Sequence, residues 1–361
     1  MKIAHIITTI CRGGAETQLL TLVREQVAQE HDVSVFFLKG EPELLHEFQS
    51  LGADVRFDLH NRKTLNQIYC FRKAIKGDSF VIHAHLPKSE LIASLAKSRN
   101  NLLISRHNAE PFFPGAPTFL SNILSLWVSW RSDGCICISQ AVKDFLNKRG
   151  ELLSSRKTWV VHYGYNSTFD TSTLTKPFEV ADPNMIGTVS RLVPQKDLPT
   201  LLQAFKILLN VNPTLRLSII GRGVEKDNLH HLARELQIMQ SIVWTDKSAN
   251  IYSKISSMRI FCLTSLYEGF GLVLLEAMQS RVPIVAARNS AIVEVLGAEY
   301  PYFFETSNPK DLANKIEGLL VEEERDIAVN YLNSRLLMFS PSLMAKKITK
   351  IYEEIKSITT N

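Results

Sequence analysis

Short apolar runs rich in β-branched residues alternate along the chain with longer stretches in which apolar positions recur at helical spacing. The first pattern predicts buried strands, and the second predicts amphipathic helices. We expect strands at residues 3–8, 33–38, 80–84, 102–105, 135–138, 159–161, 185–189, 217–220, 242–244, 260–263 and 283–286. We expect helices between them, for example at residues 15–29, 139–148, 198–209 and 272–279. Such alternation is typical of parallel sheets covered by helices on both faces, so the predicted fold class is α/β.

One segment interrupts this alternation. Residues 166–183 are rich in Ser, Thr, Pro and Asp and lack a hydrophobic period, which is typical of a linker. A chain of 361 residues is long enough for two domains with separate cores. We therefore predict two Rossmann-like, doubly wound domains, at 1–165 and 184–340, that face a ligand-binding cleft between them. We expect the amphipathic helical pattern at 341–358 to pack back on the N-terminal domain.

The composition excludes several classes of protein. No apolar run approaches the ~18 residues of a membrane-spanning helix, the N-terminus does not resemble a signal peptide, and five cysteines do not form a disulfide framework. We therefore expect a cytoplasmic protein. Residues 1–165 contain 20 Lys and Arg against 15 Asp and Glu, whereas the remainder contains 21 of each. This excess is too small for a nucleic-acid-binding surface, but it suits an anionic small ligand or an acidic membrane surface.

The strongest chemical signal is SLYEGFGLVLLEAM at residues 265–278. It joins a predicted strand to a predicted helix through a glycine turn, and a helix N-terminus reached in this way offers free amides to an anion. Glu276, in the first turns of that helix, would repel phosphate but can accept hydrogen bonds from a sugar diol. Glu268 lies on the turn and can contact a second polyol. The alternative is a pair of surface carboxylates beside an ordinary turn.

A second strand end, GTVSRLVPQKD at residues 187–197, carries two cations five residues apart. Arg191 and Lys196 suit a diphosphate leaving group, because cations stabilise the negative charge that develops on it. The alternative is a solvated basic loop in which Asp197 caps the following helix.

Glycines follow two other predicted strands. Gly221 and Gly223 follow the strand at 217–220, and Gly13 and Gly14 join the first strand to the first helix. Glycine at these positions allows the backbone to approach a ligand closely. Neither pair belongs to a G-x-G-x-x-G sequence, so a nicotinamide site is not supported.

Histidines close two predicted strands of the first half. His83 and His85 lie at the end of one strand, and His107 follows the next, which favours a site at that sheet edge over isolated structural histidines. The His-x-His pair could also bind zinc, but no neighbouring carboxylate or thiol completes a ligand set. No Asp-x-Asp sequence occurs to hold a metal–diphosphate complex. We therefore predict no metal.

Together these motifs resemble the retaining glycosyltransferases of family 4, which have the two-domain glycosyltransferase B fold. The matching segments are GGAE at 13–16, HAHLPK at 83–88, SRHN at 105–108, ISQAVKDFL at 138–146, GTVSRLVPQKD at 187–197, IIGRG at 219–223 and LYEGFGLVLLEAM at 266–278. They occur in the family's order over nearly the whole chain. The pair of Glu residues eight positions apart, with its EGFG core, is highly specific.

The resemblance implies a role for each of these residues. Glu276 should bind the ribose of a nucleotide-sugar donor, and Glu268 should bind hydroxyls of the transferred sugar. Arg191 and Lys196 should neutralise the departing diphosphate, and His107 should lie near the sugar. The remaining donor-binding residues, several of them through backbone amides, should be Gly14, Gly221, Gly223, Gly269, Phe270, Gly271, Leu272 and Val273.

The implied function is transfer of a hexose or N-acetylhexosamine from a UDP- or GDP-sugar to a saccharide or lipid-linked acceptor, in surface polysaccharide or lipopolysaccharide synthesis. The nucleotide sugar is a substrate, and we expect no cofactor. Two alternatives are a nucleotide-sugar epimerase of the same fold and a non-catalytic sugar-nucleotide-binding subunit. The intact EGFG-x4-E pattern argues against the first, and the presence of both carboxylates and both cations argues against the second.

Apolar and aromatic residues recur at helical spacing over residues 117–130, among them Phe119, Ile123, Trp127 and Trp130. A helix of this kind can cover the first sheet as part of the core, or it can lie in a membrane interface. Together with the basic first half, the second interpretation predicts peripheral contact with the cytoplasmic face of the inner membrane.

Overall fold

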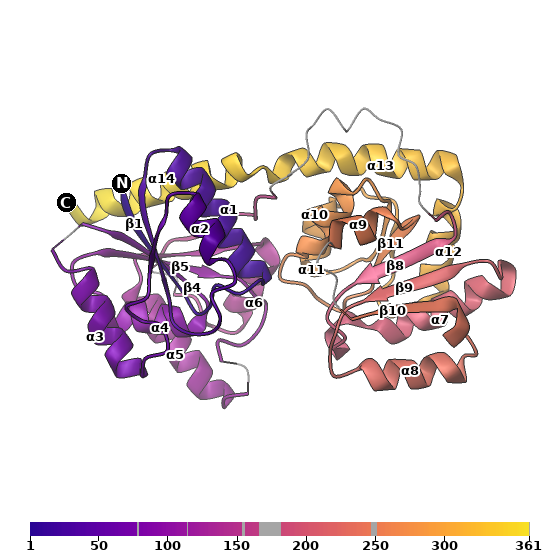
Figure 1. The fold of residues 1–361 in the computed structure, drawn as a ribbon, viewed down its shortest axis with the longest axis horizontal. Helices are drawn as coiled ribbons and strands as arrows, with labels where there is room; N and C mark the ends of the chain where they lie inside the picture. The colour runs from indigo at the N-terminus through magenta and orange to yellow at the C-terminus, as the bar shows by residue number, and fades with distance from the viewer. Residues whose placement is uncertain (78, 114, 154–155, 166–181, 247–250, 361) are drawn as a thin grey trace. The chain divides into compact units, whose positions relative to one another are not determined.

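A computed structural model describes residues 1–361 except 78, 114, 154–155, 166–181, 247–250 and 361 (Figure 1). The chain divides into two compact units. The first comprises Met1–Asn166 and Phe339–Asn361, and the second comprises Ser167–Met338. Most of the predicted linker, 166–183, lies outside the described residues.

Parallel strands form the centre of the first unit. Its described residues contain a seven-stranded sheet in the order β3-β2-β1-β4-β5-β6-β7. The strands are β1 (Lys2–Ile7), β2 (Asp32–Phe37), β3 (Asp54–Arg56), β4 (Val81–His85), β5 (Asn101–Arg106), β6 (Gly134–Cys137) and β7 (Thr158–Val160). The strands at the middle of the sheet are almost entirely buried, which explains their continuous apolar runs.

Seven helices belong to the described part of the first unit. They are α1 (Gly14–Ala28), α2 (Leu45–Ser50), α3 (Thr64–Ala74), α4 (Pro87–Ala96), α5 (Thr118–Arg131), α6 (Gln140–Lys148) and α14 (Pro341–Thr360). The last of these comes from the end of the chain and lies beside α1 (Figure 1). Its apolar residues, including Met344, Ile348 and Ile351, join the core of the first unit.

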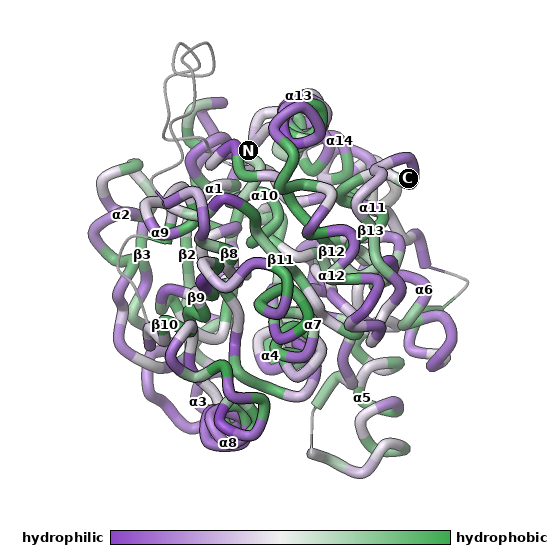
Figure 2. Tube along the Cα trace, turned by 90° about the vertical axis from the view of Figure 1, so that its right-hand side faces the viewer, coloured by the Kyte–Doolittle hydropathy of each residue, from purple (hydrophilic) through white to green (hydrophobic). Residues whose placement is uncertain are grey.

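The second unit repeats this architecture. Its described residues contain a six-stranded parallel sheet in the order β10-β9-β8-β11-β12-β13. The strands are β8 (Met185–Val189), β9 (Arg216–Ile220), β10 (Ile242–Thr245), β11 (Ile260–Leu263), β12 (Ile284–Ala287) and β13 (Phe303–Phe304). Strand β11 is hydrophobic along its length, whereas helix α8 (Lys226–Glu235) is largely hydrophilic (Figure 2).

The helices of the second unit follow its strands in turn. They are α7 (Leu198–Val211), α8 (Lys226–Glu235), α9 (Ile251–Ser256), α10 (Leu272–Gln279), α11 (Ser290–Leu296), α12 (Pro309–Leu319) and α13 (Glu322–Leu336). The described residues also contain three short 3-10 helices: η2 (Pro194–Lys196) and η3 (Met239–Ser241) in the second unit, and η4 (Leu337–Phe339) where the chain returns to the first. None of the helices described here combines the length and the apolar composition needed to cross a membrane.

The α/β prediction is confirmed, and every predicted strand is present with its ends within one residue of the expected positions. Two edge strands, β3 and β13, were not predicted. They have three and two residues, which is too short for a periodic pattern to show.

The strand order reverses direction once in each sheet, between β1 and β4 and between β8 and β11. The connections that leave the carboxyl ends of such a strand pair run to opposite faces of the sheet, which opens a crevice where ligands bind. In the second unit this point is flanked by the loop after β8 and the loop after β11. These loops carry Lys196 and Glu268.

Candidate functional site

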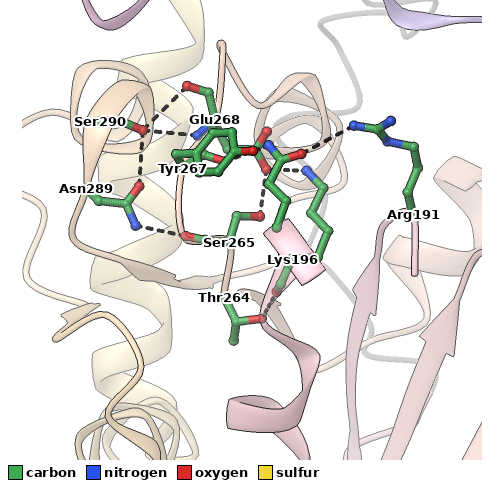
Figure 3. A network of polar contacts seen from close by, with 9 residues as sticks. Arg191, Lys196, Thr264, Ser265, Tyr267, Glu268, Asn289 and Ser290 are labelled. Carbon is green, nitrogen blue, oxygen red and sulfur yellow. Dashed lines mark hydrogen bonds and ion pairs between the residues drawn. The ribbon is translucent and has the colours of Figure 1, made fainter. Parts of the chain in front are cut away.

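Lys196 and Glu268 meet at the crevice beside β8 and β11. The Nζ atom of Lys196 lies 2.5 Å from Oε1 of Glu268, and the two side chains are only 12% and 9% exposed (Figure 3). The fold thus joins two residues that lie 72 positions apart in the sequence. The sequence predicted a site role for each of them, but it did not predict that they pair.

Fixed donors hold the Glu268 carboxylate in place. The hydroxyl of Ser265 donates to Oε1 of Glu268 at 2.7 Å, and the backbone N–H of Glu268 donates to Oγ of Ser290 at 3.0 Å. Asn289 then donates from Nδ2 to the carbonyl of Ser265 at 2.8 Å. The carboxylate is therefore positioned before any ligand arrives (Figure 3).

The loop that carries Lys196 is bound to the loop that carries Glu268 through the backbone as well. Thr264 donates from its hydroxyl to the carbonyl of Lys196 at 2.7 Å, and the N–H of Leu266 donates to the carbonyl of Gln195 at 2.8 Å. Asp197, with φ of 45°, ends η2 in the left-handed region. These contacts hold the backbone from which the Lys196 side chain extends.

Arg191 is the more exposed of the two cations. Its guanidinium donates to Oε1 of Gln195 at 3.4 Å, and Gln195 in turn donates to the carbonyl of Tyr267 at 2.8 Å (Figure 3). Among the residues that the structure describes, Arg191 forms no ion pair with a carboxylate. Its charge is therefore not offset by a described carboxylate, whereas Lys196 lies against Glu268.

Glu276 is a partly buried carboxylate on α10. Burial raises its pKa to about 7, and no described side chain donates a hydrogen bond or an ion pair to it. Gly271, with φ of 84°, precedes this helix, and the N–H groups of Leu272 and Val273 lie in its first turn. Amides of a first turn have no partner within their own helix. This end of α10 thus combines amides that have no partner within the helix with a carboxylate that no described side chain pairs with.

Phe270 places its side chain in the interior of the second unit. Its ring is only 2% exposed and belongs to the core of the second unit. Its neighbour Gly269 has no side chain to offer. The predicted roles of both residues as providers of backbone amides are therefore compatible with their positions.

Gly221 and Gly223 are required by the packing of two loops. A Cβ atom built at Gly221 would lie 1.8 Å from the carbonyl oxygen of Ser190, and one at Gly223 would lie 2.0 Å from that of Leu192. The loop after β9 therefore crosses directly over the loop after β8. This close approach explains both glycines without a ligand, so they position the Arg191 loop whether or not they also touch a donor.

Gly14 and His107 belong to the first unit. Gly14 is the first residue of α1, next to Gly13, whose Cβ would lie 2.4 Å from Oε2 of Glu16. His107 follows β5, and both of its ring nitrogens have partners. Nε2 lies 3.1 Å from Nδ1 of His85, and Nδ1 lies 2.5 Å from the hydroxyl of Tyr163.

His5 is a member of this histidine cluster that the sequence did not reveal. It lies within the apolar strand β1, and the parallel register places it opposite His83 on β4. Ring nitrogens of His5, His83 and His85 lie within 4.8 Å of one another, which is close enough to hold a metal ion. All six of these nitrogens are already in hydrogen bonds, so a metal would have to displace them.

Two family models match the chain. The model described as Glycosyltransferase Family 4 matches residues 12–169, and the model described as Glycosyl transferases group 1 matches residues 171–332. Together they cover both units apart from the two ends of the chain and residue 170.

Individual proteins give the same picture. An uncharacterized glycosyltransferase of Haemophilus influenzae is 32% identical over 178 residues, which is 48% of this chain and 48% of the relative. In Campylobacter jejuni, GalNAc-alpha-(1->4)-GalNAc-alpha-(1->3)-diNAcBac-PP-undecaprenol alpha-1,4-N-acetyl-D-galactosaminyltransferase is 25% identical over 375 residues, which covers 99% of each chain. The crystal structure of Anabaena HepE with UDP-glucose has a TM-score of 0.79 at 18% identity, over 98% of this chain and 100% of that one. The chain therefore belongs to the family 4 glycosyltransferases, and its two parallel-sheet units have the glycosyltransferase B fold.

Proposed function

We propose that this protein is a retaining glycosyltransferase that moves a hexose or N-acetylhexosamine from a nucleotide sugar to a saccharide or lipid-linked acceptor. The observation that carries the proposal is the pairing of Glu268 with Lys196 beside the accessible Arg191. A carboxylate that accepts sugar hydroxyls then lies next to two cations that can stabilise a diphosphate. Transfer of an activated sugar requires this combination of charges.

The proposed donor is a UDP-sugar. HepE, which shares the fold, was crystallised with UDP and with UDP-glucose, and this supports a uridine nucleotide. In this chain, the Glu276 carboxylate is the proposed acceptor for the two ribose hydroxyls. A partly buried carboxylate that no described side chain pairs with gains two hydrogen bonds from a diol, which offsets the cost of its desolvation.

The chemistry follows from where charge develops. The bond between the anomeric carbon and the phosphate oxygen breaks, so that positive charge grows on the sugar ring and negative charge on the diphosphate. Arg191, Lys196 and the first-turn amides of α10 stabilise the negative charge. The acceptor hydroxyl forms the new bond on the same face of the sugar, and its proton passes to the departing phosphate oxygen. No cofactor enters this scheme, and we propose that these cations act in place of a metal.

The acceptor is the least constrained part of the proposal. The Campylobacter jejuni relative carries an undecaprenol diphosphate-linked saccharide in its name, which supports a lipid-linked oligosaccharide and a place in surface polysaccharide or lipopolysaccharide synthesis. Helix α5 buries Val128 together with three small polar residues, Ser121, Ser125 and Ser129, and leaves Phe119 68% exposed. An exposed aromatic face on a helix in the basic unit suits peripheral contact with an anionic membrane surface at the cytoplasmic face of the inner membrane.

A panel of UDP- and GDP-sugars tests the function. We expect one donor to raise the melting temperature and to be hydrolysed slowly without acceptor, also in the presence of EDTA. Arg191→Ala and Lys196→Ala should each lower turnover by about 10²-fold or more, because each removes a preorganised charge. Lys310→Ala, at an exposed position on α12, is the matched control. Kinetics of the two site variants that match those of the control would contradict the proposal.

A separate measurement tests membrane contact. We expect the protein to float with vesicles that contain anionic lipid and not with neutral vesicles. Replacement of Phe119 and Ile123 by Ser should abolish flotation while the fold is kept, since both side chains are exposed. A wild-type protein that stays entirely in the soluble fraction would remove this part of the proposal.

A further inference from the structure

A buried chain of hydrogen bonds in the first unit plays no part in the function proposed above. It runs through the interior of the unit and links strands, helix α1 and the C-terminal helix α14. In order, its members are Tyr163, His107, His85, His5, Gln26, Tyr352, His83 and Ser105.

The separations within this chain are all those of hydrogen bonds. They are Tyr163 OH–His107 Nδ1 2.5 Å, His107 Nε2–His85 Nδ1 3.1 Å, His85 Nε2–His5 Nδ1 3.0 Å, His5 Nε2–Gln26 Oε1 2.8 Å, Gln26 Nε2–Tyr352 OH 3.2 Å, Tyr352 OH–His83 Nδ1 2.7 Å and His83 Nε2–Ser105 Oγ 2.7 Å.

The histidines of the chain are neutral. Burial lowers the pKa of His5 and of His107 to about 4, and it lowers the pKa of His83 and of His85 well below 6.5. A neutral imidazole has one nitrogen that donates and one that accepts. Each ring therefore passes the direction of one hydrogen bond on to the next.

Gln26 sets the direction of the whole chain. Its Oε1 atom can only accept, so His5 carries its proton on Nε2 and accepts on Nδ1. His85 must then donate from Nε2 to His5, and His107 must donate from Nε2 to His85. The Nδ1 atom of His107 accepts from the hydroxyl of Tyr163.

The second branch follows the same logic. The Nε2 group of Gln26 donates to Tyr352, so Tyr352 donates onward to Nδ1 of His83, and His83 donates from Nε2 to Ser105. The Gln26 side chain thus accepts through Oε1 and donates through Nε2. With this orientation, every imidazole in the hydrogen-bonded chain is the Nε2–H tautomer.

We propose that Gln26 is a positioning residue for His107, which it holds in the single Nε2–H tautomer through His5 and His85. The inference rests on contacts within the first unit, so it stands or falls independently of the donor and the acceptor. Both ring nitrogens of His107 are occupied in this arrangement. His107 therefore presents a fixed, neutral ring at the end of β5 instead of acting as a general base.

Histidine tautomers can be measured directly. The full-length protein labelled with ¹⁵N-histidine is examined by long-range ¹H–¹⁵N correlation at pH 7. We expect His5, His85 and His107 each to show a protonated Nε2 and an unprotonated Nδ1. A cationic His107, or one protonated on Nδ1, would overturn the proposal.

A pair of variants separates positioning from packing. In Gln26→Leu the acceptor that fixes the direction is lost, and we expect His107 to populate the Nδ1–H tautomer as well. Gln18→Leu is the matched control. Gln18 lies buried on the same helix and lines a cavity of about 30 Å³ beside His107, but it forms no hydrogen bond to any of the eight residues named above. In this control His107 should remain wholly Nε2–H. The same result in Gln26→Leu would refute the role of Gln26.

A second variant keeps the test decisive if Gln26→Leu does not fold. Tyr163→Phe removes the donor at the other end of the chain, and His107 should remain Nε2–H because Gln26 still sets the direction. A change of tautomer would show that Tyr163 sets it instead. One equivalent of Zn²⁺ should leave the resonances of His5, His83 and His85 unchanged, and shifts typical of metal-bound nitrogens would show that the cluster is a metal site instead.

Discussion

The pair formed by Lys196 and Glu268 makes a prediction that does not depend on substrate. Both side chains are nearly buried, so removal of one partner leaves the other as an isolated charge in the interior of the second unit. We consider Lys196→Met, Glu268→Gln and the double variant. These substitutions approximately preserve the length of each side chain and remove its charge.

The contacts of the pair determine the size of the effect. In Lys196→Met the carboxylate keeps only the hydroxyl of Ser265, and loss of one partner of a buried pair costs about 3 kcal/mol. In Glu268→Gln the amide oxygen still accepts from both former donors, so we expect a loss of about 1.5 kcal/mol. The double variant leaves no charge unpaired and should lose about 2 kcal/mol. The coupling energy of the cycle is then about 2–3 kcal/mol.

Unfolding of the second unit can be followed by itself. Of the four tryptophans, only Trp244 lies in this unit, where its ring is 4.3 Å from that of His230. A background with Phe at residues 127, 130 and 159 makes its fluorescence specific for the second unit. The cycle is then measured by urea denaturation, with Lys310→Met as the control for an exposed cation. We expect this control to change stability by less than about 0.5 kcal/mol.

Additivity is the result that would refute the reasoning. If the destabilisations of the two single variants sum to that of the double variant within about 0.5 kcal/mol, the two charges do not stabilise one another. The contact at 2.5 Å would then be incidental to the fold.

Three further predictions concern single positions. Burial raises the pKa of Glu276 to about 7, so the stability contributed by the neutral carboxyl group is present below pH 4.5 and is lost as the pH rises through 7. At pH 8, Glu276→Gln should therefore be more stable than wild type by about 3 kcal/mol. The same variant should bind UDP more weakly by calorimetry. Burial lowers the pKa of His107 to about 4, so the stability contributed by its neutral ring is present above pH 6.5 and is lost as the pH falls through 4. Between pH 7 and pH 5, the free energy of unfolding of wild type should therefore fall by about 2 kcal/mol more than that of His107→Gln in urea titrations. Gly221→Ala should lower the melting temperature of the second unit by several degrees, because its Cβ would lie 1.8 Å from the carbonyl oxygen of Ser190. By contrast, the Cβ of Gly318→Ala in α12 would meet no atom within 4 Å, so this variant should raise the melting temperature. A Gly221→Ala protein as stable as wild type would show that the two loops can separate.

The sequence predicted the sheets well because each central strand is buried on both faces and reads as a continuous apolar run. The same logic fails at the sheet edges, where β3 and β13 bury too few residues to produce a pattern. On the helix at 117–130, the apolar residues Phe119, Ile123 and Trp130 are exposed. Its packed face combines Val128 with Ser121, Ser125 and Ser129, and small hydroxyl side chains carry no hydrophobic signal.

The candidate site was predictable as a set of strand ends but not as a geometry. Glu268 and Lys196 were each assigned to the carboxyl end of a parallel strand, and parallel strands bring such ends to one edge of a sheet. Their direct contact depends on the strand order, which places β8 beside β11, and no local pattern encodes that neighbourhood. The reason for Gly221 was also hidden, since the crossing of two loops is a property of the tertiary structure.

The histidine chain shows why buried polar networks are harder still to predict. His5 stands in an apolar strand and Tyr352 in an amphipathic helix, and neither departs from the pattern of its element. Their hydrogen bonds depend on Gln26, which lies 326 positions before Tyr352 in the sequence. A buried imidazole is stable only if both nitrogens are bonded, so each member of the chain must be present for the others to be tolerated. Polar complementarity therefore specifies the packing of α14 on the first unit as well as apolar area does. The sequence pattern reveals only the apolar area.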